Sequence, residues 1–207
     1  MSTYELTVQF DSQGLKIINA ADQLVTMVKS VGNGRPVAWV AFHPMQLNTV
    51  TWTETYSVYS STTQIQDGAE IFTQSTQPAV GGNTYTLAAG QFDNGKPGLP
   101  ASNYGVNNQD PNFQIDGVQM ITSGLYQGAV VNGQSTASPL NAVAVPYLET
   151  GQFTPIEKVQ VFASSYQNNG LVISAVSSLA LTVDFTGQLT QTIHYNDATN
   201  QFAFGPQ

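Results

Sequence analysis

The chain has 207 residues, of which 41% are hydrophobic and only 9% are charged, and its formal net charge at pH 7 is −8. This composition excludes a disordered chain, because enough apolar surface is present to form a core. The five basic residues are scattered and form no positive stripe, so we expect no nucleic-acid partner. The lack of cysteine excludes disulfides, thiolate chemistry and cysteine zinc sites.

The first predicted element is a strand at residues 5–10, "ELTVQF", in which Leu6, Val8 and Phe10 share one parity. The preceding residues contain no basic segment followed by an apolar one, as a secretory signal would. We therefore expect a protein that is cytoplasmic as synthesised, with release by an unconventional route left open.

Strand patterns continue along the chain, at residues 23–31, 36–42, 48–61, 179–189 and 190–197. Residues 36–42 are apolar on both parities, which indicates a strand buried on both faces. Residues 48–61 alternate, with Glu54 on the apolar parity between Trp52 and Tyr56. Turn residues separate the runs, and no convincing amphipathic helix appears, since the best candidate at residues 19–28 is rich in β-branched residues that favour strand. The chain is predicted to be all-β, with the spacing of a sandwich or barrel.

Two segments of the chain, one in each half, also resemble each other in sequence. Shifting it by 103 residues aligns 18–64 with 121–167 without gaps and gives ten identities in 47 positions. Glu54 then matches Glu157, whereas Trp39 and Trp52 match Ala142 and Pro155. We predict two tandem antiparallel β-sandwich-like units from an internal duplication, with pseudo-symmetric packing left open. The expected boundaries are a first unit at 1–95, a Gly/Pro/Asn-rich linker at 96–110 and a second unit at 111–207.

Motifs for catalysis are missing from the sequence. His43 and His194 have no metal-ligand spacing, and neither a nucleophile elbow nor a phosphate-binding loop occurs. Loop carboxylates such as Asp93, Asp110 and Asp197 offer oxygen ligands for calcium, but they lack the spacing of a calcium loop. We therefore predict no enzyme activity, no cofactor and no metal, while calcium at these loops stays open.

Aromatic rings beside amides and carboxylates are the most suggestive feature. In carbohydrate sites a ring covers the apolar face of a sugar, and polar side chains bind its hydroxyl groups. Trp52 is the candidate ring because only the first copy has it, although the sequence favours a place in the core for both Trp39 and Trp52. The sequence allows three interpretations of Glu54: an edge residue, a buried framework acid or an acceptor of hydrogen bonds from a ligand. The predicted ligand-binding residues are Asn48, Trp52, Glu54, Tyr56 and Glu157.

These patterns favour a non-enzymatic, lectin-like protein with two diverged β units, whose partners are glycans or glycoproteins. Two alternatives stay open. The first is a structural, self-assembling β protein that forms homo-oligomers, since few charges oppose contact between copies. The second is a component of a pore-forming toxin that acts at a membrane surface, because strands with Thr, Ser and Gln opposite apolar residues resemble membrane hairpins.

Overall fold

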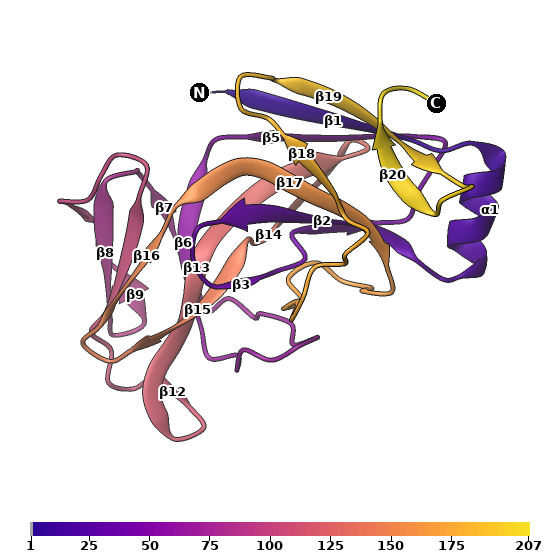
Figure 1. Ribbon diagram of the computed structural model, residues 1–207. Coiled ribbons are helices and arrows are strands. Elements are labelled where there is room, and N and C mark those ends of the chain that lie inside the picture. The colour runs from indigo at the N-terminus through magenta and orange to yellow at the C-terminus, as the bar shows by residue number, and fades with distance from the viewer. Residues whose placement is uncertain (1) are drawn as a thin grey trace.

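The computed structural model describes residues 2–207 and contains twenty strands and one helix within that range, so the predicted all-β class is confirmed (Figure 1). The largest sheet has eleven strands: β1 (Thr3–Gln9), β3 (Arg35–Pro36), β5 (Leu47–Thr53), β6 (Tyr56–Ser61), β7 (Ser75–Ala79), β12 (Gln114–Ile115), β13 (Val118–Val131), β14 (Gln134–Pro139), β15 (Asn141–Pro146), β19 (Thr190–Asn196) and β20 (Gln201–Phe204). A second sheet has four strands: β2 (Leu24–Val31), β4 (Val40–Phe42), β17 (Pro155–Ser164) and β18 (Leu181–Asp184). A third has five: β8 (Asn83–Ala88), β9 (Gln91–Phe92), β10 (Lys96–Pro97), β11 (Tyr104–Asn108) and β16 (Thr150–Phe153).

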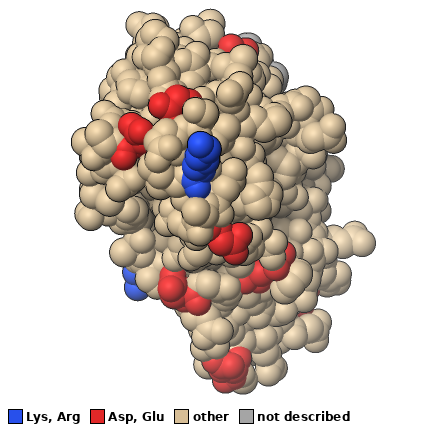
Figure 2. Space-filling view, turned by 90° about the vertical axis from the view of Figure 1, so that its right-hand side faces the viewer, with Lys and Arg blue, Asp and Glu red and all other residues tan. Residues whose placement is uncertain are grey.

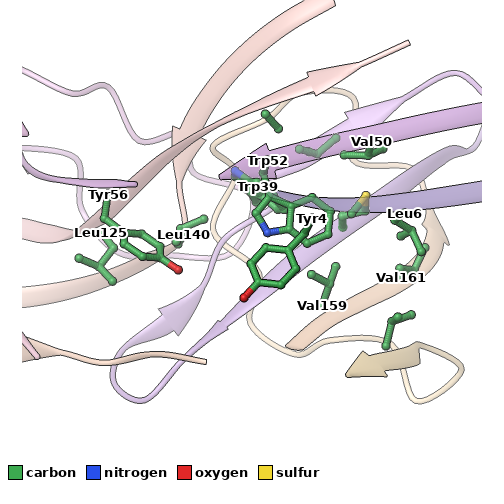
Figure 3. Close-up of a cluster of buried hydrophobic side chains, with 14 of the residues drawn as sticks. Tyr4, Leu6, Trp39, Val50, Trp52, Tyr56, Leu125, Leu140, Val159 and Val161 are labelled. Carbon is green, nitrogen blue, oxygen red and sulfur yellow. The ribbon is translucent and has the colours of Figure 1, made fainter. Parts of the chain in front are cut away.

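The main core contains buried residues from all three sheets (Figure 3). The alternation of apolar and polar residues along the strands explains how this core forms, because every second residue of a strand points to the same face. On β1 and β5 the buried residues include Leu6 and Val50, which lie opposite each other in the antiparallel pair. The four-stranded sheet contributes Met27 from β2 and Val161 from β17 to the same cluster.

Each sheet contains strands from both predicted units. β13 pairs with β5 and β6, β17 pairs with β2, and β1 pairs in parallel with β19. The predicted linker at 96–110 contains β10 and β11, and β11 pairs with β8 and β16 on its two sides. Its Val106 is buried. The boundaries expected from the sequence therefore do not coincide with the sheets, and the internal duplication stays a prediction.

The expectation that no helix forms is wrong at one place, because α1 spans Ser12–Ala20. Asp11 caps it: its Oδ1 accepts a hydrogen bond from the Gly14 nitrogen at 2.6 Å. The stretch "DSQG" at residues 11–14 consists of residue types common in turns, and the helix that begins at Ser12 is only nine residues long, too short for a clear helical period. Packing supplies the missing stabilisation, since Ile18 is buried in the core and Gly14 lies against Tyr195.

The outer surface carries few charges. On the face shown in Figure 2, acidic and basic side chains are isolated among neutral ones. Among residues 2–207, no helix has the length and apolar character needed to cross a membrane.

We expect Asp11→Ala to lower the free energy of unfolding by about 1 kcal/mol, because the first turn of α1 loses its side-chain acceptor. Chemical denaturation followed by circular dichroism measures this loss. Lys16→Ala on the exposed side of the same helix is the matched control and should be nearly neutral. Equal effects of both substitutions would contradict the capping role.

Candidate functional site

The predicted strand at 48–61 is divided at Glu54. β5 ends at Thr53 and β6 begins at Tyr56, so the chain changes partners within two residues. Glu54 stabilises this corner: its Oε1 accepts a hydrogen bond from the Tyr4 hydroxyl at 2.6 Å, and its Oε2 accepts one from the Ser2 nitrogen at 3.3 Å. The carboxylate therefore joins the corner to the beginning of β1.

Trp52 lies inside the molecule and not on its surface. Its ring meets Trp39 edge-to-face at 5.4 Å and Phe185 at 4.9 Å between centroids, and 3% of the residue is exposed (Figure 3). Trp39 is fully buried and donates from Nε1 to the Gln127 carbonyl at 3.1 Å. Both rings are thus core residues, which is the interpretation that the sequence favours. In this arrangement the face of Trp52 is not available to a sugar.

A buried lysine lies at the centre of the predicted residues. The Nζ of Lys29, on β2, is 3.1 Å from Oε2 of Glu157 and 3.0 Å from the Tyr56 hydroxyl. The same hydroxyl donates to Oε1 of Glu157 at 2.8 Å. The Lys29 side chain is fully buried, whereas that of Glu157 is 20% exposed. The ion pair therefore has one partner in the core and one at its edge.

Aromatic faces complete the surroundings of this ammonium group. Nζ lies 5.1 Å from the ring centroid of Tyr56, 5.8 Å from that of Trp52 and 5.9 Å from that of Trp39. Aromatic faces attract cations, and the attraction is stronger where water is excluded. Together with the carboxylate of Glu157, they offset part of the cost of burying the charge of Lys29.

The titration behaviour of the cluster follows from burial and hydrogen bonding. Burial lowers the pKa of Lys29, and the charge of Glu157 opposes this shift. Burial, with the hydrogen bond to Glu54, raises the pKa of Tyr4 to about 12. The same bond lowers the pKa of Glu54. Burial, followed by the charge of Glu157, also raises the pKa of Tyr56. Tyr4 and Tyr56 therefore stay protonated at neutral pH and act as hydrogen-bond donors to the two acids.

Asn48 lies apart from this cluster, at the other end of β5. It is fully buried, its Oδ1 accepts from the Met45 nitrogen at 2.9 Å, and its Nδ2 donates to the carbonyls of Met45 and Val8. These bonds engage both ends of the amide with the backbone. The structure thus brings Trp52, Tyr56 and Glu157 into contact with Lys29, places Glu54 nearby through Tyr4, whose ring packs on Trp52, and leaves Asn48 outside this cluster.

An open groove lies elsewhere, between β15, β16 and the turn after β2. Its volume is about 500 Å³. Gly151, at the start of β16, permits the close packing of one wall, because a Cβ there would lie 2.8 Å from the side chain of Val145. The groove is lined by Asn33, Val143, Ala144, Val145, Pro146, Tyr147, Glu149, Thr150, Gly151 and Gln152.

The polar groups of this groove are available to a ligand. Within residues 2–207 the structure gives no hydrogen bond to the Tyr147 hydroxyl, the Glu149 carboxylate or the Gln152 side-chain amide. Asn33 donates from Nδ2 to the Gln152 carbonyl at 3.2 Å, which leaves its Oδ1 free. Sequence reasoning missed this site, although Tyr147, Glu149 and Gln152 are close in the chain, because Asn33 joins them only through folding.

A smaller depression of about 280 Å³ opens above the edge of Trp52, where β5 leaves β13. Hydroxyl side chains line most of its wall, with Thr51, Thr53 and Thr55 on one side and Ser135 and Thr136 on the other. It contains no carboxylate and no amide among its lining residues, so its chemistry is less varied than that of the groove.

The described residues contain no group of three or more His, Cys, Asp or Glu side chains placed to hold a metal ion. Comparison with protein-family models, with curated proteins and with solved structures finds no match to this chain. The case for a function therefore rests on the chemistry of the chain's own residues.

The buried ion pair gives a first prediction for this region. Glu157→Gln leaves the ammonium of Lys29 without its counter-charge, so we expect the free energy of unfolding to fall by about 3 kcal/mol. Urea denaturation measures the change. The control is Asp184→Asn, which breaks the exposed pair with Lys158 at a similar distance of 3.0 Å and should have only a small effect. A larger loss for Asp184→Asn than for Glu157→Gln would contradict this account.

Glu54 gives a second prediction, on pH dependence. Its folded pKa lies below the ordinary value of 4.5, so its stabilising effect is present above that pH and is lost as the pH falls through the folded pKa. We expect Glu54→Gln to lower the melting temperature at neutral pH, and the gap to the wild type to close on acidification below about pH 4.5. Thermal denaturation across pH measures the gap, with the exposed Glu5→Gln as control. A gap that stays constant with pH would show that Glu54 acts by packing alone.

Proposed function

We propose that the protein is a non-enzymatic, lectin-like protein that binds glycans or glycoproteins in the groove at Tyr147. One observation carries the proposal: an open groove of about 500 Å³ combines an aromatic ring with a carboxylate, amides and a hydroxyl. Its volume lies within the usual range for small-ligand sites. We prefer it to the residues predicted from the sequence, because Tyr56 and Glu157 are engaged with Lys29 and the amide of Asn48 is bonded to the backbone.

The arrangement of side chains suits a neutral saccharide. Pro146, Val143 and the ring of Tyr147 offer apolar surface for the C–H face of a sugar. The carboxylate of Glu149 accepts hydrogen bonds, and the amide of Gln152 both accepts and donates them. A hydroxyl group of a sugar does both as well, so each of these side chains has a matching group on the ligand.

The groove supports binding and not hydrolysis. Hydrolysis of a glycosidic bond ordinarily needs two carboxyl groups about 5–10 Å apart across the bond. Among the residues that line the groove only Glu149 carries a carboxylate. A single acid acts as a hydrogen-bond acceptor in a binding site, which agrees with the absence of catalytic motifs in the sequence.

The surroundings of the two related acids support the proposed duplication. Glu54 lies between β5 and β6, and Glu157 lies where the pairing of β17 with β2 shifts register. Each follows a strand that ends a few residues earlier, and each accepts a hydrogen bond from a tyrosine hydroxyl. We propose that the segments around the two acids descend from one ancestral segment, now set into a common framework.

Self-assembly is a second candidate, favoured by β20. This short strand ends the path of the eleven-stranded sheet and exposes Phe204. An unpaired edge can add a strand from another copy. Light scattering across protein concentrations tests this candidate: a constant molar mass argues against it.

The glycan proposal predicts that Tyr147→Ala abolishes binding to whichever glycan the wild type retains on an array, because the sugar loses its aromatic platform. Glu149→Gln should weaken it by about tenfold, through loss of a charged acceptor. Titration calorimetry measures both. Phe72→Ala, which removes an exposed ring outside the groove, is the control and should bind as the wild type does. Wild-type binding by Tyr147→Ala, or no binding to any glycan by the wild type, would refute the proposal.

A further inference from the structure

Four asparagines of the chain are followed directly by glycine: Asn33, Asn94, Asn132 and Asn169. In such a pair the main-chain nitrogen of the glycine can attack the side-chain amide of the asparagine, because glycine has no Cβ to hinder the approach. Asparagine is a thermolabile residue for this reason. The fold holds the attacking nitrogen and the amide differently in the four pairs.

Two pairs are held by their amides. Oδ1 of Asn132 accepts from the Thr49 nitrogen at 2.8 Å, and its Nδ2 donates to Asn48 at 3.3 Å. Oδ1 of Asn169 accepts from the Ala41 nitrogen at 2.6 Å. In the second case the attacking group is held too, since the Gly170 nitrogen donates to the Ala38 carbonyl at 2.7 Å. Both amides would have to break these bonds before they could react.

The third pair, at Asn94, is held at its glycine. The nitrogen of Gly95 donates to Oδ1 of Asp93 at 2.9 Å, in the same turn where Asp93 also accepts from Thr86. That hydrogen bond must break before the nitrogen can attack the amide of Asn94.

The restraints are weaker at Asn33, where the amide makes a single hydrogen bond and the glycine nitrogen makes none among residues 2–207. Both Asn33 and Gly34 are exposed, and no hydrogen bond from the Gly34 nitrogen occurs within residues 2–207. The Asn33 amide makes one long bond, from Nδ2 to the Gln152 carbonyl at 3.2 Å, and its Oδ1 is free. Its main-chain carbonyl is held by Nδ2 of Asn141 at 2.7 Å, which keeps the turn in place while the side chain stays available.

The fold also requires the glycine. Gly34 has a φ of +95°, and a Cβ on it would lie 2.7 Å from the Ala142 carbonyl oxygen. Another residue in this place would be strained and would clash with backbone. The turn between β2 and β3 therefore requires the glycine of the reactive Asn33–Gly34 pair.

We propose that Asn33 is a site of spontaneous deamidation at the rim of the groove, and that this reaction limits the working life of the binding site. The Gly34 nitrogen attacks Cγ of Asn33 and loses its proton, the Cγ–Nδ2 bond breaks, and ammonia leaves. Water then opens the cyclic imide at one of its two carbonyls and yields aspartate or isoaspartate. No oxidant or other co-reactant is needed.

The expected effect on the groove rests on the proposed function. Aspartate at position 33 lacks the Nδ2 donor and places a negative charge beside the Gln152 carbonyl. Isoaspartate in addition lengthens the main chain of the turn. Both changes disturb the wall that Asn33 shares with Gln152, so affinity should fall by about tenfold, as expected for one lost hydrogen bond and added repulsion.

The test is to incubate the full chain at mildly alkaline pH and physiological temperature and to map its peptides by mass spectrometry at intervals. We expect Asn33 to convert at least ten times faster than Asn94, Asn132 or Asn169. In denaturant the selectivity should disappear, because the four pairs then share one environment. Faster conversion at any of the other three sites in the folded protein, or the same order of rates in denaturant, would overturn the proposal.

A second arm separates this inference from the proposed function. Asn33→Asp imitates one product, and its glycan affinity is compared with that of freshly purified and aged wild type. Aged protein should lose affinity in proportion to conversion at Asn33, and Asn33→Gln should prevent the loss on ageing. If no glycan binds the wild type, the proposed function fails while the peptide map still decides the chemistry. Full affinity in a completely converted sample would refute the effect on the groove.

Discussion

The buried charge of Lys29 is the constraint on which the arrangement of the sheets depends. An ammonium group without contact to water is costly, so its surroundings must supply a counter-charge and aromatic faces together. Lys29 and Glu157 come from β2 and β17 of the four-stranded sheet, whereas Tyr56 and Trp52 come from β6 and β5 of the large sheet. The hydrogen bonds of the Tyr56 hydroxyl to both members of this ion pair therefore fix how the two sheets meet, in a way that apolar side chains, which pack in many arrangements, do not.

The sequence predicted the fold class because alternation is local. The alternation of apolar and polar residues alone predicts that Leu6, Val8 and Val50 are buried, and the structure places them in the core. The corner at Glu54 and the short helix after Asp11 depend on contacts with residues far away in the chain. Tyr4 holds the first, and Tyr195 packs against the second. Periodicity contains no information about such contacts, so both features were missed.

The candidate site shows the same limit more sharply. Trp52 attracted attention because it differs between the aligned halves, yet that ring fills core volume where the other half has Pro155. The groove joins Asn33, from a turn after β2, to Tyr147 and Gln152, and the sequence treats these as unrelated turn residues. The sequence does predict the kind of chemistry that the groove offers, an aromatic ring beside amides and an acid. The position of the site in the chain could not be predicted, because a groove forms between packed strands and no single strand encodes it.

The parallel pairing of β1 with β19 has a consequence for biosynthesis. Glu5 lies opposite Thr190 and Gln9 opposite His194, so β1 leaves the ribosome long before its partner β19 is synthesised (Figure 1). Until then β1 pairs only with β5, and its other edge stays open to unintended partners. Pairing across such a sequence distance is slow, since a long loop must close before the contact forms. Nascent chains of this protein should therefore depend on protection by chaperones until synthesis has passed β19.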